Sequence, residues 1–230
     1  MWKIRNPVLR VALGLVVAAA VDLVALYLGH SAPIPESSFV PSSFVIHSVM
    51  LLLSLLIIWV IPRASFADFG FTTRDYRFKP TILLWVLPTA VLSSLALFAP
   101  GPSRLPGPLA GFSQLQLILF VWIYASVCEE VLTRGLLQTL VAGDSPRASR
   151  TKKLTMPIVV SALFFGAMHL VLIPSMGPAA LVPIIMTTFL GFLAAYYRQS
   201  TGSLVPAILV HALFNVGGML PQWVAQWVRG

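Results

Sequence analysis

Residues 114–141 read QLQLILFVWIYASVCEEVLTRGLLQTLV, a long apolar run that two adjacent glutamates and an arginine interrupt. At helical rise this run is long enough to cross a bilayer. Glu129, Glu130 and Arg134 fall near its middle, where each ionised side chain costs about 2.5 to 3.5 kcal/mol to insert. Ionised groups are kept at that depth only with polar partners or a function. The run therefore predicts a transmembrane helix that carries a functional site.

Helical spacing gives the two glutamates different neighbours. Glu130 and Arg134 are four residues apart, so they share a face of the helix and can pair. Glu129 points about 100° away from Glu130 and is free to face another helix. The remaining polar residues of the chain must show what Glu129 faces.

The composition is that of a polytopic membrane protein. Of the 230 residues, 58% are hydrophobic and only 10% are charged, and the mean hydropathy is +0.90. No soluble domain of this size needs so much apolar surface. The net charge of +8 does not indicate nucleic acid as a partner, because basic loops are what fixes the orientation of a membrane protein. The partner that we expect is the lipid bilayer.

Seven apolar stretches predict an all-α bundle of about seven (six to eight) transmembrane spans around a polar cavity. We expect one membrane domain over residues 1–230, and a break in the last stretch at Gly217, Gly218 and Pro221. The stretches cover about 11–28, 43–61, 80–98, 114–141, 154–173, 179–197 and 204–228.

Loop charges predict the orientation of the bundle. Alternate loops, counted from the N-terminus, hold twelve Lys and Arg residues on one side, against only Arg104 and Arg229 on the other. This bias predicts a cytoplasmic N-terminus. The short chain and short loops indicate a minimal protein of a prokaryotic plasma membrane.

Two other stretches carry unusual polar residues. His169 ends the segment FGAMH at 165–169, and His211 and Asn215 lie four apart in HALFN at 211–215. Each of these residues alone would be explained as an interhelical hydrogen-bonding group. Together with the glutamates they are too costly in hydrocarbon unless they converge in one polar cavity. His47, near the start of the second stretch, is predicted to be interfacial.

A glutamate with two histidines predicts hydrolytic chemistry. A carboxylate in a cavity of low dielectric constant can take a proton from water. Neutral histidines can orient that water or bind a metal, and Asn215 or a histidine can donate to an oxyanion. The reaction class indicated is hydrolysis of an amide within or beside the membrane.

Three motifs resemble those of the CPBP (Abi) family of intramembrane proteases, which includes CAAX prenyl endopeptidases and bacteriocin-processing enzymes. EEVLTR at 129–134 matches the family's EExxxR motif, 165–169 matches FxxxH, and 211–215 matches HxxxN, in the family's order. The resemblance covers 114–215, which we interpret as a catalytic core. Residues 1–113 match no feature of the family, and their role stays unassigned.

The resemblance implies a role for each motif residue. Glu129 would activate the attacking water with His169 as its partner, and His211 and Asn215 would line the cavity and stabilise the oxyanion. The substrate implied is a membrane-associated peptide or protein, which in eukaryotic members of the family is a prenylated CAAX protein. The resemblance thus implies an endopeptidase.

The remaining motif residues, Glu130, Arg134 and Phe165, are expected to support the site rather than react. No metal is assigned. If a zinc ion is bound, Glu129, His169 and His211 are the ligands that we expect, although the HExxH spacing of zincins is absent.

Two rival classes stay open from the sequence. A catalytically silent binding or immunity protein of the same fold would keep the cavity without cutting. A small proton-coupled transporter would use the Glu and His cluster as a relay, although no inverted repeat is visible in the sequence.

Overall fold

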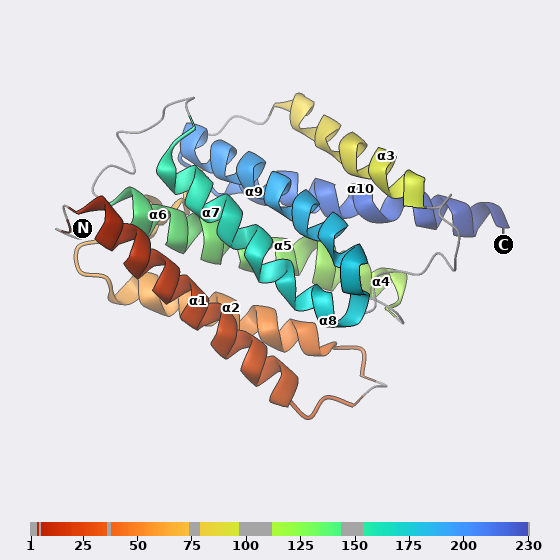
Figure 1. The fold of residues 1–230 in the computed structure, drawn as a ribbon, viewed down its shortest axis with the longest axis horizontal. Helices are drawn as coiled ribbons and strands as arrows, with labels where there is room; N and C mark the ends of the chain where they lie inside the picture. Colours follow the sequence, from red (N-terminus) through yellow and green to blue (C-terminus); the bar gives the residue numbers. More distant parts are fainter. Residues whose placement is uncertain are drawn as a thin grey trace.

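The computed structural model describes residues 4, 6–35, 38–73, 79–96, 112–143 and 154–229, and these form a helical bundle (Figure 1). No strand occurs in these ranges, which confirms the all-α prediction. Arg74, Arg77, Arg104 and the basic residues at 147–153, on which the predicted orientation partly rests, lie outside them.

An N-terminal hairpin forms one side of the bundle. Helix α1 (Pro7–Ser31) begins with Pro7 at its first position, and the Asn6 side chain accepts a 2.9 Å hydrogen bond from the Val8 amide. Helix α2 (Ser42–Val60) returns beside it. Gly29 lets the two helices approach closely, because a Cβ at that position would meet Ile46 at 2.1 Å.

A single helical rod, Gln114–Ala142, runs through the centre of the molecule. The rod has five consecutive segments. They are α4 (Gln114–Gln116), the π-helical η4 (Leu117–Ala125), α5 (Ser126–Glu130), the π-helical η5 (Val131–Leu137) and α6 (Gln138–Ala142). Both glutamates thus lie on a short α-helical segment between two π-helical ones. Such irregular turns are frequent at functional sites.

The second half of the bundle packs on the other side of the rod. Helix α7 (Met156–Met168) and helix α9 (Leu181–Thr201) form a hairpin that turns through η6 (His169–Leu172), α8 (Ile173–Met176) and η7 (Gly177–Ala180). Gly177 takes a positive φ of 57° in that turn. Helix α10 (Val205–Arg229) packs on α9 and on α3 (Val86–Ala96), which follows the 3-10 segment η2 (Pro80–Trp85).

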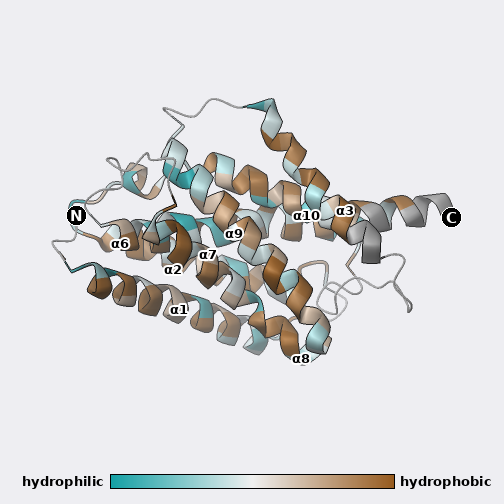
Figure 2. Cartoon of the chain, turned by 45° about the horizontal axis from the view of Figure 1, so that its top comes forward, coloured by the Kyte–Doolittle hydropathy of each residue, from teal (hydrophilic) through white to brown (hydrophobic). Residues whose placement is uncertain are grey.

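The bundle is suited to a membrane. Among the described residues, four helical stretches are long and apolar enough to cross one, at Pro7–Ser31, Ser42–Val60, Gln114–Ala142 and Met156–Thr201. Large apolar side chains such as Leu23, Leu52 and Ile185 are exposed on the outside, and Figure 2 shows hydrophobic residues along the outer helices. These features support the prediction from composition that this is a membrane protein. The prediction of about seven spans is not confirmed by these four stretches.

The predicted break in the last helix is wrong. Helix α10 continues without interruption from Val205 to Arg229, through Gly217, Gly218 and Pro221. At Gly217 a Cβ would lie 2.1 Å from Thr89 Oγ1 and 2.3 Å from the Val86 carbonyl oxygen. Gly217 thus serves close packing of α10 on α3 rather than a change of backbone direction.

Loops and helix ends that the charge bias predicts on one side of the membrane lie together at one end of the bundle. Arg10, near the start of α1, donates to the carbonyl of Ala142 at the end of the rod at 3.1 Å. Arg198, near the end of α9, donates to the carbonyl of Asp68 at 3.0 Å. This Asp68 lies in η1 (Phe66–Phe69), the short segment that follows α2. This arrangement is expected if successive helices alternate in direction, because alternate loops then lie at the same end.

Candidate active site

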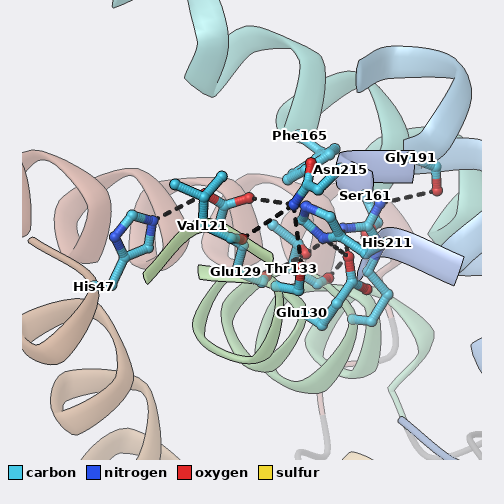
Figure 3. A network of polar contacts seen from close by, with 12 residues as sticks. His47, Val121, Glu129, Glu130, Thr133, Ser161, Phe165, Gly191, His211 and Asn215 are labelled. Carbon is cyan, nitrogen blue, oxygen red and sulfur yellow. Dashed lines mark hydrogen bonds and ion pairs between the residues drawn. The ribbon is translucent and has the colours of Figure 1, made fainter. Parts of the chain in front are cut away.

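A buried ion pair anchors the rod. Arg134 Nη1 lies 2.9 Å from Glu130 Oε1, and both side chains are completely buried. The guanidinium also donates through Nη2 to the carbonyl of Gly191 on α9 at 3.0 Å, and its Cζ lies 4.5 Å from the centre of the Phe165 ring on α7 (Figure 3). The pairing that the i,i+4 spacing predicts is confirmed. Arg134 thereby joins the rod to α7 and α9.

His211 on α10 connects this pair to the second glutamate. Its Nδ1 lies 2.9 Å from Glu130 Oε1, and its Nε2 lies 3.6 Å from Glu129 Oε2. Because Glu130 also accepts from Arg134, we assign the hydrogen of this contact to His211 Nδ1. The other nitrogen of the ring is then turned toward Glu129.

Glu129 differs from Glu130 in exposure and in partners. Its side chain keeps 14% of its surface exposed, whereas that of Glu130 keeps none. Its Oε1 is 3.1 Å from His47 Nε2, and its Oε2 is 3.6 Å from His211 Nε2. An imidazole therefore stands beside each carboxylate oxygen of Glu129 (Figure 3). Arg134 hydrogen-bonds to Glu130 rather than to Glu129.

His169 is the first residue after α7, where the helix tightens into η6. Its Nδ1 bonds to the Phe165 carbonyl at 2.9 Å. The Phe165 ring lies edge-on to both imidazoles, with centroids 5.1 Å from His169 and 5.2 Å from His211. His169 and Glu129 interact electrostatically, although the described residues include no hydrogen bond between them. The Phe165 ring therefore packs against both imidazoles and keeps His169 and His211 apart.

Asn215, one turn beyond His211, faces the rod. Its Nδ2 donates at 3.2 Å to the Val121 carbonyl and at 3.2 Å to Ser126 Oγ. These bonds fasten α10 to the rod next to the glutamates (Figure 3). The predicted convergence of the motif helices is thus seen in the structure, while the oxyanion role of Asn215 stays a prediction.

His47 is the residue that the sequence interpretation missed. It was expected at a membrane interface, yet α2 places its imidazole on Glu129, with only 15% of the side chain exposed. The one available signal was that a histidine within an apolar stretch needs a partner. That signal could not identify Glu129 as the partner. The N-terminal hairpin packs on the rod through apolar side chains, and no sequence motif marks those contacts.

No three His, Cys, Asp or Glu side chains are grouped as ligands of one metal ion anywhere in the part of the chain that the structure describes. Glu129, His169 and His211, the ligands expected if a zinc ion is bound, do not form such a group.

Comparison with known families gives a match, which covers the part of the chain that holds the three motifs. Residues 111–217 match the family described as type II CAAX prenyl endopeptidase Rce1-like. We call residues 111–217 the Rce1-like segment. All three motifs lie inside the Rce1-like segment, so the resemblance that they indicate is confirmed, while His47 lies outside it. No curated protein and no solved structure matches the chain.

Proposed function

We propose that the protein is an intramembrane endopeptidase in which Glu129 activates water to hydrolyse a peptide bond of a membrane-associated protein or peptide. The Rce1-like segment supports the reaction class. The observation that carries the proposal is the contrast between the two adjacent glutamates. Glu130 is completely buried and bonded to Arg134, whereas Glu129 is partly accessible and its ion-pair partners among the described residues are imidazoles. Glu129 is thus the carboxylate available for proton transfer.

In the proposed reaction, Glu129 Oε2 takes a proton from water while the water oxygen adds to the scissile carbonyl carbon. The same proton then passes to the leaving nitrogen as the C–N bond breaks. The 3.6 Å separation of Oε2 from His211 Nε2 is too long for a direct hydrogen bond, and a water bonded to both atoms would be held there. His169, whose Nδ1 bonds to the Phe165 carbonyl, would orient the same water through its Nε2.

Glu130, Arg134 and Phe165 hold this arrangement in place. Their contacts tie α7, α9 and α10 to the rod, so the imidazoles keep their positions relative to Glu129. Asn215 would stabilise the oxyanion if its amide left the Val121 carbonyl when substrate binds.

We further propose that α1, α2, α3, the rod, α7, α9 and α10 all cross the membrane, which gives seven spans. Helices α7 and α9 are antiparallel halves of one long apolar stretch, as the contact of Gly191 with Ala162 and of Gly166 with Thr188 requires. With seven spans, the charge bias supports our proposal that the N-terminus lies in the cytoplasm of a prokaryotic cell.

The test compares wild type with Glu129→Gln after reconstitution into vesicles that contain native membrane proteins, and maps newly formed peptide termini. Glu36→Gln is the matched control, because Glu36 lies outside the motifs and outside the described residues. We expect the same termini from wild type and Glu36→Gln, and none of them from Glu129→Gln. Identical termini from all three proteins would contradict the proposal and favour a binding protein, and Glu129-dependent proton flux without cleavage would favour a transporter.

A further inference from the structure

The N-terminal hairpin lies outside the Rce1-like segment and yet supplies a direct partner of Glu129. We infer that His47 is a positioning residue of the site, which holds Glu129 by Oε1 and so leaves Oε2 for the water. The inference rests on the proposed function of Glu129. It gives the α1–α2 hairpin a role in the reaction.

The orientation of the His47 ring is fixed by its own helix. Nδ1 lies 2.6 Å from the carbonyl of Ser43, four residues earlier. A carbonyl oxygen only accepts, so Nδ1 carries a hydrogen, and the opposite edge of the ring faces Glu129. Glu129 acts as a base in the proposed reaction and is therefore a carboxylate, so the hydrogen in the 3.1 Å Nε2–Oε1 contact belongs to His47, which is then protonated on both nitrogens. The protonated imidazole holds the carboxylate on α2.

The position of α2 is itself fixed close to His47. The neighbouring Ser48 hydroxyl lies 2.8 Å from Tyr124 OH on the rod, and the Phe44 ring stacks on the Tyr124 ring with centroids 4.9 Å apart. The hairpin is thus attached to the same part of the rod that carries Glu129.

Without His47, little in the structure would fix the Glu129 carboxylate. Its terminal torsion is intrinsically broad, and its other ion-pair partner among the described residues, His211, is 3.6 Å away. A base that rotates away from the bound water loses rate, since a small misplacement of reacting groups can cost about 10²-fold. Substrate binding should change little, because the contact that His47 makes is with the base, Glu129.

The kinetic test uses His47→Phe and His47→Gln on a peptide that contains a cleavage site mapped with wild type. We expect His47→Phe to lower kcat by about 10- to 100-fold with little change in KM. His47→Gln should recover most of kcat, because its amide can still donate to Oε1. His30→Phe and His30→Gln are matched controls, since the exposed His30 makes the same bond to a carbonyl four residues earlier, at 2.7 Å, away from the motifs. Unchanged kcat in His47→Phe, or equal loss in the Phe and Gln variants, would overturn the inference.

A second measurement does not depend on activity. The Tm of His47→Phe, Glu129→Ala and the double variant forms a cycle, in which residues in contact give non-additive changes. We expect the loss from Glu129→Ala to shrink when His47 is already absent. Additive changes would overturn the inference whatever the activity. A wild type that cuts nothing but shows the non-additive change would overturn the proposed function and leave the contact established.

Discussion

Arg134→Met is expected to destabilise the protein strongly, because it leaves a buried carboxylate without its cation. Arg134 and Glu130 are both fully buried, and the substitution removes the 2.9 Å pair together with the 3.0 Å bond to the Gly191 carbonyl. Removing one partner of a buried pair costs about 3 to 5 kcal/mol. For a chain of 230 residues this corresponds to a loss of roughly 6 to 20 °C in Tm.

Thermal unfolding in detergent micelles measures this loss. The double variant Arg134→Met/Glu130→Gln should be more stable than Arg134→Met alone, because no uncompensated charge stays buried. Lys79→Met is the control, since Lys79 is an exposed cation and its loss should leave Tm within the range of ordinary surface substitutions. If Arg134→Met and Lys79→Met had the same Tm, the ion pair would not anchor the rod, and the reasoning from burial would be refuted.

Three further predictions concern the packing of the site. Gly191→Val should lower both Tm and cleavage, because a Cβ there would lie 2.9 Å from the backbone of Ala162 and force α7 away from α9; normal thermal unfolding would contradict this. Gly217→Leu should likewise lower Tm by separating α10 from α3, and a stable variant would mean that these helices are not in close contact. Asn215→Ala should cost about 1 to 3 kcal/mol through its two lost hydrogen bonds, which chemical unfolding can measure; an unchanged midpoint would show that those bonds do not hold α10.

The helices and the pairing of Glu130 with Arg134 could be predicted from the sequence because both follow from local rules. Apolar length predicts a transmembrane helix, and the i,i+4 spacing predicts a pair on one face. The convergence of His211 with the glutamates could also be predicted, since polar groups in hydrocarbon must find one another. The structure bears this out through the 2.9 Å contact of His211 with Glu130.

The features that could not be predicted depend on how distant helices dock. His47 meets Glu129 because α2 packs beside the rod, and no periodicity within either helix specifies that neighbour. Gly217 permits two opposite interpretations, a broken helix or a close contact. Only the position of α3 decides between them.

The central claim is that the two adjacent glutamates have separate tasks, with Glu129 acting on substrate and Glu130 holding the structure. The most direct test measures cleavage and Tm side by side for Glu129→Gln and Glu130→Gln. We expect Glu129→Gln to lose at least about 10²-fold in rate with the smaller change in Tm, and Glu130→Gln to show the larger loss of Tm, because Arg134 is left as an unpaired buried charge. Retained cleavage in Glu129→Gln, together with a Tm as low as that of Glu130→Gln, would contradict the account.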